Sequence, residues 1–168
     1  MKRLIILLLC FLMTLSACAQ PNPAQDIRDP VSFFYLRTAF SYGQQDAVIV
    51  CEQREADGHR EDLEYLLSLY IQGPIGDGLE SPFPSGLRLI EAAVLEDTVF
   101  VTLSSRFSTL SDMDMTLACA CLTKTCLSLT DARQVTISCD GQTPGSSFSI
   151  TLTEDDLLLL DTSTSEPE

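Results

Sequence analysis

Histidine, lysine and tryptophan are scarce in this chain of 168 residues. It contains one histidine, no tryptophan and two lysines, Lys2 and Lys124. Ten basic residues stand against 24 acidic ones, giving a formal net charge of −14. This balance excludes a nucleic-acid binder, because phosphate contacts need clustered Lys and Arg. No Gly-x-Ser-x-Gly nucleophile frame or Gly-rich phosphate loop occurs. We therefore expect no enzyme activity, no catalytic residue and no cofactor.

Long hydrophobic runs are also missing, with one exception at the start of the chain. Residues 4–15 are apolar apart from Thr14, and Lys2 and Arg3 precede them. A dozen residues are too few to cross about 30 Å of hydrocarbon, but this length is typical of a secretory signal segment. The whole chain is 45% hydrophobic, which is too apolar for a disordered protein, and it is long enough for one domain.

The signal segment ends in Leu15, Ser16, Ala17 and Cys18, which resembles the bacterial lipobox. That resemblance implies that Cys18 is acylated and becomes the new N-terminus; the alternative is a conventional signal peptide with an incidental cysteine. Cleavage would remove two basic residues and no acidic one, so the formal charge would fall from −14 to −16. We assign residues 1–17 to a lipoprotein signal peptide, 18–30 to a proline-containing tether, 31–161 to a folded domain and 162–168 to a disordered tail.

Hydrophobic periodicity predicts two helices within the folded domain. The first has an apolar stripe at i, i+3, i+4, i+7 and i+8, and Gly73 and Pro74 end it. The second begins at a capping box formed by Ser111 and Asp114. The apolar positions of the first helix are Leu63, Leu66, Leu67, Tyr70 and Ile71, and those of the second are Met115, Ala118, Cys119, Leu122, Cys126 and Leu129.

Strands are predicted on both sides of each helix. Residues 31–37 and 47–53 form a hairpin-like pair, 87–95 and 98–103 form a second pair, and 134–139 form a fifth strand. Residues 148–152 and 157–160 are predicted as a final hairpin. The order β-β-α-β-β-α-β favours an α+β fold, a single small domain with a largely antiparallel or mixed sheet and two helices packed on one face.

The order of several short motifs resembles the GerMN domain of sporulation and spore germination proteins. The family pattern runs from Leu-Leu and Gly-Pro through Gly-Leu and Pro-x-Gly to a strand ending in Leu-Ser with a following Phe, and closes on Asp-Gly. This chain departs from it at Thr102, where Asp is usual, and at Phe83, where Ile is usual. The matching positions are expected to be structural, and they are Gly73, Pro74, Gly78, Leu79, Pro84, Gly86, Leu103, Ser104, Phe107, Asp140 and Gly141.

Cysteine spacing raises two further possibilities. Cys119, Cys121 and Cys126 suggest a zinc site, but on a helix Cys119 and Cys121 point to nearly opposite sides, so we expect no metal site. Cys51 and Cys139 each follow an Ile on one strand face, so both are candidates for an inward position and a mutual disulfide. The alternative is that one or both thiols are free.

Two functional hypotheses follow from these observations and the family resemblance. The first is a lipid-anchored, extracytoplasmic interaction domain of the cell envelope, linked to sporulation, germination or envelope assembly, with membrane contact through Cys18 and a protein partner. The second is an extracytoplasmic module that binds wall glycan or a small molecule. A pocket lined by Tyr or Phe would favour the second hypothesis, and an exposed sheet edge would favour the first. His59 beside Gly58 is expected to be a solvated loop residue.

Overall fold

Buried and exposed side chains alternate along the first strand, and this pattern sets the inner face of its sheet. The computed structural model describes residues 27–38, 48–140 and 146–157. In β1 (Pro30–Arg37) the side chains of Val31, Phe33 and Tyr35 are buried, and the residues between them are less covered. A strand with one apolar face must bury that face against another layer.

The described residues contain seven strands, which are divided between two sheets. One sheet has the order β2-β1-β3 and is antiparallel; the other has the order β4-β5-β6-β7 and contains one parallel pair, β5 with β6. The α+β class and mixed sheet are confirmed, although the strands do not form one continuous sheet. The other elements are β2 (Ile49–Glu55), α2 (Leu63–Ile71), β3 (Leu79–Glu80), β4 (Leu89–Leu95), β5 (Thr98–Leu103), α3 (Asp112–Leu129), β6 (Gln134–Asp140), β7 (Ser147–Thr153) and the short 3-10 helices Ser105–Thr109 and Asp155–Leu157.

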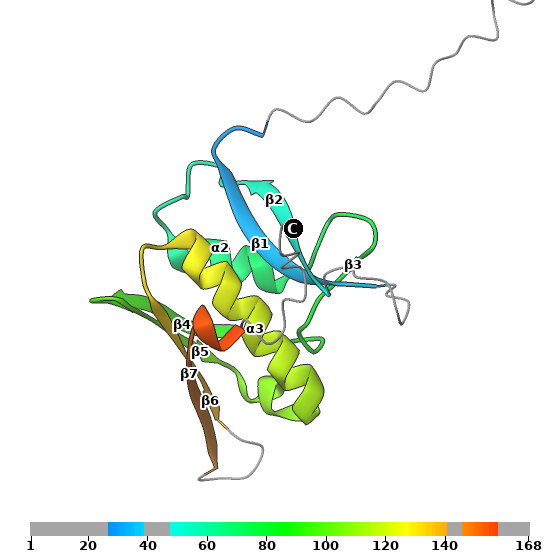
Figure 1. Cartoon of the computed structure of the whole chain (residues 1–168), viewed down its shortest axis with the longest axis vertical. Coiled ribbons are helices and arrows are strands. Elements are labelled where there is room, and N and C mark those ends of the chain that lie inside the picture. The colour runs from blue at the N-terminus through cyan, green and yellow to red at the C-terminus, as the bar shows by residue number, and fades with distance from the viewer. Residues whose placement is uncertain (1–26, 39–47, 141–145, 158–168) are drawn as a thin grey trace, which may run out of the picture.

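The helix α3 lies between the two sheets (Figure 1). It packs against β1 on one side and against β6 on the other. A helix covered from both sides has no solvated face along its middle, and residues 118–123 are all buried. Cys121 is as deeply buried as Cys119, although the two residues were expected on nearly opposite sides of the helix, because both sides of its middle are covered.

The helix α2 begins and ends as its sequence predicts. The side chain of Asp62 accepts a hydrogen bond of 2.9 Å from the amide of Tyr65, which caps the N-terminus. Gly73 follows the C-terminal residue of the helix with φ of +100°, a left-handed conformation that favours glycine. Leu66, Leu67 and Tyr70 form its buried stripe.

Within the described residues, the second strand of the predicted C-terminal hairpin does not begin at Leu157. β7 pairs along its whole length with β6, in an antiparallel register that places Ile137 opposite Ile150. Leu157 is buried, but it ends a 3-10 helix and does not lie in a strand. Residues 158–160 of the predicted final strand lie outside the described residues, as do residues 39–47 between the first two strands.

Candidate functional site

The residues of the family motif are spread over several loops and strand ends of the fold. Gly73 and Pro74 follow α2, Gly78 precedes β3 with φ of +78°, and Leu79 begins that strand. Pro84 and Gly86 lie in the loop before β4 and line a groove of about 580 Å³ beside α2. Leu103 and Phe107 are fully covered core residues.

Ser104 connects the start of β4 to the end of β5. Its amide donates to the carbonyl of Arg88, and its hydroxyl accepts from the amide of Arg88. Asp140 is exposed at the end of β6, and Gly141 and Cys18 lie outside the described residues.

A buried ion pair lies behind the loop that follows α2. Glu52 and Arg54 point inward from β2, where they are 9% and 6% exposed. The Nη2 atom of Arg54 lies 2.7 Å from Oε2 of Glu52, and Nε donates a second bond of 2.8 Å to the same oxygen. The guanidinium also lies over the rings of Phe33 and Tyr35, at 5.2 and 5.6 Å from their centroids. Two charges so far from solvent are stable only because each has several partners.

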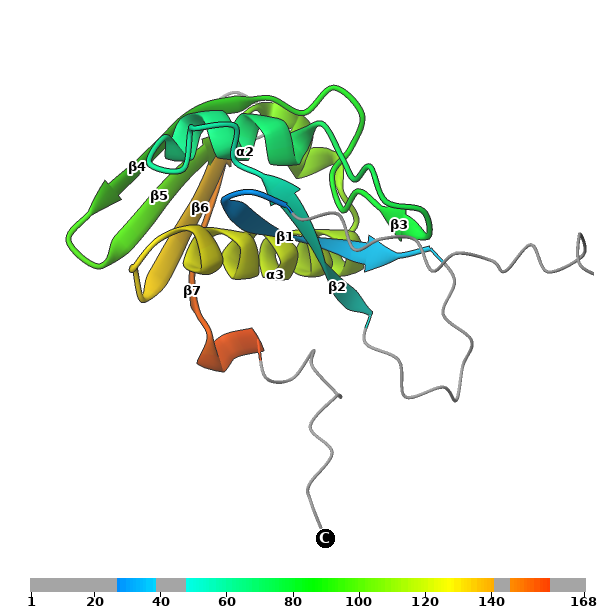
Figure 2. The same ribbon diagram turned by 90° about the horizontal axis from the view of Figure 1, so that it is seen from above.

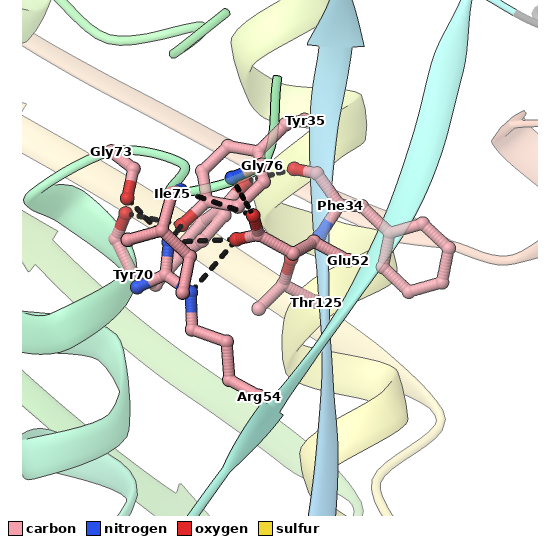
Figure 3. Close-up of polar contacts among 9 residues, drawn as sticks. All are labelled: Phe34, Tyr35, Glu52, Arg54, Tyr70, Gly73, Ile75, Gly76 and Thr125. Carbon is pink, nitrogen blue, oxygen red and sulfur yellow. Dashed lines mark hydrogen bonds and ion pairs between the residues drawn. The ribbon is translucent and has the colours of Figure 1, made fainter. Parts of the chain in front are cut away.

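Glu52 and Arg54 together hold the loop of residues 73–76 (Figure 3). Oε1 of Glu52 accepts hydrogen bonds from the amides of Ile75, at 3.0 Å, and Gly76, at 2.6 Å. Arg54 donates to the carbonyl of Gly73. A Cβ atom on Gly76 would lie 3.0 Å from Oε1 of Glu52, so glycine is needed there for close approach. The result is a fixed loop that presents the Ile75 side chain, which is 79% exposed.

Two tyrosines extend the network from this ion pair to α3. Arg54 donates to the hydroxyl of Tyr35, which donates to the carbonyl of Tyr70 at 3.0 Å. The Tyr70 hydroxyl donates to the carbonyl of Phe34 at 2.7 Å, and the amide of Phe34 donates to Oγ1 of Thr125 at 3.0 Å. Burial raises the pKa of both phenols well above the usual range, so the two tyrosines are neutral at any physiological pH.

Side chains of the two helices satisfy the edge of β1 that faces away from β2. The main-chain amide and carbonyl of Phe34 bond to the hydroxyls of Thr125 and Tyr70, as described above. The hydroxyl of Ser128 donates to the carbonyl of Ser32 at 2.9 Å. β3 pairs only with the last two residues of β1. Hydroxyl groups of α2 and α3 therefore replace a neighbouring strand for the middle of β1.

The described cysteines are free thiols, and the proposed disulfide is absent. Cys51 is exposed on β2 of the three-stranded sheet, whereas Cys139 is buried in the other sheet. The inward position expected for Cys51 is wrong because the face that β2 turns to the core carries Glu52 and Arg54. Burial raises the pKa values of Cys119 and Cys121 to about 12, so these thiols stay protonated and act as small apolar groups.

The remaining ionisable groups are dispersed over the surface. His59 is half exposed, stacks on Tyr65 with centroids 4.0 Å apart, and places Nδ1 3.9 Å from Asp62. Within the described residues, no group of three or more His, Cys, Asp or Glu side chains is arranged to hold a metal ion. None of the helices in the same ranges is long and apolar enough to span a membrane.

Sequence reasoning missed the ion pair, which is the main polar feature of the interior. The available signal was the opposite charge of Glu52 and Arg54 two residues apart on one strand, since residues at i and i+2 share a face. Which face is buried follows only from the register that places Glu52 opposite Phe33.

The fold and its polar interior define a class: a small α+β domain of two sheets around a central helix, whose buried charges hold a loop. A family model described as sporulation and spore germination, Germane, matches residues 33–144. The chain belongs to this family, so the predicted resemblance to GerMN domains is confirmed.

Three solved structures are similar to the chain at low sequence identity. The tandem GerMN domains of the sporulation protein GerM from Bacillus subtilis match with a TM-score of 0.50 and 16% identity, over 68% of this chain and 39% of that one. The first GerMN domain of the same protein gives 0.49 and 14%, over 75% and 99%. A Clostridium perfringens protein described as a lipoprotein gives 0.48 and 19%, over 76% and 88%. The first of these shows a shared fold. No curated protein sequence matches the chain.

Proposed function

We propose that this chain is a lipid-anchored, extracytoplasmic interaction domain of the bacterial cell envelope. It serves sporulation or germination by binding another envelope protein, and it has no chemistry of its own. Membership of the sporulation and germination family supports the process. The lipobox-like sequence ending at Cys18 and the tether that follows support the anchor. The glycan-binding alternative is less favoured, because Phe83 is the sole Tyr or Phe lining the 580 Å³ groove of the motif loops.

The observation that carries the proposal is the distribution of exposed apolar side chains. Six large hydrophobic residues are exposed in the described part of the chain, and four of them lie in the β4–β5 hairpin. The register of the hairpin places Val94 on the face of the buried Val99 and Phe100 on the other face, so the exposed apolar side chains are concentrated in this one element and not on a single flat patch. Exposed apolar side chains concentrated in this way favour a contact site for another macromolecule. The four residues are Ile90 at 56%, Val94 at 49%, Leu95 at 65% and Phe100 at 42% exposure.

Fatty-acid labelling tests the anchor. Cells that express the chain are fed an alkyne fatty acid, and we expect label on the wild-type protein and none on Cys18→Ala. The matched control is Cys51→Ser, which removes an exposed thiol of the domain and should keep the label. Label that persists on Cys18→Ala would reject lipidation at this residue.

In-cell crosslinking tests the contact. A defined envelope protein should crosslink to the wild-type chain, and the purified chain should show no turnover of ester or peptide substrates and no tight binding to wall glycans. Turnover or tight glycan binding without a crosslinked protein would reject the interaction hypothesis.

A further inference from the structure

The four-stranded sheet is open at β4. This strand pairs with β5 on one side, and no strand of the described residues pairs with its other side, as Figure 2 shows. The two-residue turn after β4 closes on the pair Leu95 and Thr98. Antiparallel alternation then directs the main-chain groups of Ala92 and Val94 away from β5. These are groups that another strand can pair with.

A groove runs along this edge. One hollow of about 530 Å³ lies between the start of α2 and residues 92–94 of β4. A second hollow of about 490 Å³ continues it to the end of α3, and the two share Glu61, Leu63 and Val94. We call these two hollows together the β4 groove. Apolar side chains line it, including Leu63, the 49% exposed Val94 and Leu129.

The walls of the β4 groove are acidic. Five carboxylates line the two hollows, and they are Glu61, Asp62, Glu64, Glu96 and Asp131. Two basic residues, Arg60 and His59, also line the hollows. Arg60 is already paired with Asp29 at 2.7 Å, and His59 lies next to Asp62. The groove therefore combines a few apolar side chains in a mainly polar lining, an unpaired strand edge and an excess of negative charge. Each property favours a different feature of a ligand.

We propose that the β4 groove binds an extended segment of another protein, in which basic side chains alternate with apolar ones, by strand addition to β4. The segment's main chain pairs with Ala92 and Val94, its apolar side chains pack near Leu63, and its Lys or Arg side chains meet the carboxylates. A second copy of this chain fits poorly, because each copy carries a formal charge of −14 and would bring the same acidic walls together. This inference rests on the proposed function and names the surface and partner chemistry for it.

Peptide binding to the full-length chain tests the inference. The probe is an eight-residue peptide of alternating lysine and valine, with a glutamate–valine peptide as the control ligand. We expect the wild-type chain to bind the lysine–valine peptide and not the glutamate–valine peptide. The affinity should fall as the salt concentration rises. Glu61→Lys with Glu64→Lys should weaken binding about tenfold or more, because two attractive wall charges become repulsive. Val94→Pro should abolish binding, because proline is tolerated on an edge strand but lacks the amide donor; Val94→Thr keeps the amide and should still bind.

Circular dichroism at matched temperature verifies that each variant folds, and the Glu61 and Glu64 changes give a second test that does not involve the main chain. Equal binding of the lysine peptide to Val94→Pro, or none to the wild type at 1 mM, would overturn the proposal. A wild-type dimer that Val94→Pro dissolves would make a second copy the occupant and would also overturn it. In cells, a partner crosslinked equally to Val94→Pro and wild type would reject this surface while leaving the proposed function intact. Absence of any crosslinked partner would count against the proposed function itself.

Discussion

Removing the Glu52 carboxylate should destabilise the domain strongly, because this carboxylate is half of a buried ion pair. Glu52→Ala leaves the Arg54 guanidinium buried without its ion-pair partner, and breaking such a pair from one side costs about 3–5 kcal/mol. The remaining contacts of Arg54 with Tyr35, Gly73 and two aromatic rings place the cost toward the lower value. The amides of Ile75 and Gly76 lose their acceptor, but both residues are exposed and water can replace it.

A domain of this size has a free energy of unfolding of about 5–15 kcal/mol, so the change removes a large fraction of it. We expect urea unfolding, followed by circular dichroism, to give a loss of about 3 kcal/mol or more, and the melting temperature to fall by roughly 10 °C. Glu55→Ala is the matched control, because it removes the same charge from the exposed end of the same strand. Glu52→Gln should lie between the two, since it keeps an acceptor for the loop. A loss below about 1 kcal/mol for Glu52→Ala would refute the stated role of the ion pair.

Three further predictions concern backbone conformation, pH and thiols. Gly73→Val should cost about 1 kcal/mol or more in unfolding free energy, because φ of +100° is strained for a β-branched residue; Gln72→Ala, with φ of −64°, is the control, and equal effects would contradict the assignment. Stability should fall as pH rises from about 9, because the buried thiols of Cys119 and Cys121, with pKa of about 12, ionise only after unfolding; urea curves that are unchanged between pH 8 and pH 10.5 would refute this sign. Brief iodoacetamide treatment of the native protein should label the tryptic peptide of Cys51 and leave that of Cys126 unlabelled, as mass spectrometry of the peptides will show.

Local elements could be predicted from the sequence because each depends on neighbouring residues. The stripe from Leu63 to Ile71 predicts α2 with the bounds that the structure has, and the left-handed Gly73 ends it as expected. The capping box of Ser111 and Asp114 begins α3, where the Asp114 amide donates to the Ser111 hydroxyl at 3.4 Å. These patterns need no knowledge of the rest of the chain.

Features that depend on register between distant segments could not be predicted. The sequence of β2 has Cys51 and Gln53 on one face and Glu52 and Arg54 on the other, and ordinary hydrophobicity favours the wrong face as the buried one. Pairing with Phe33 and Tyr35 on β1 decides the matter, because the aromatic rings cover the guanidinium. The division into two sheets could not be predicted from local sequence either, because it depends on the packing of α3 between β1 and β6, which are far apart in the chain.

The hydroxyl bonds between α3 and β1 also set how the domain carries a pulling load. A tether attached at the start of β1 would draw that strand along its own axis, so its bonds to β2 would be loaded in parallel and not one after another. Thr125 and Ser128 connect the other side of β1 to α3 by hydrogen bonds, and α3 packs against β6. The load therefore spreads from one strand into both sheets, and a partner held at β4 would be pulled through the whole body of the domain.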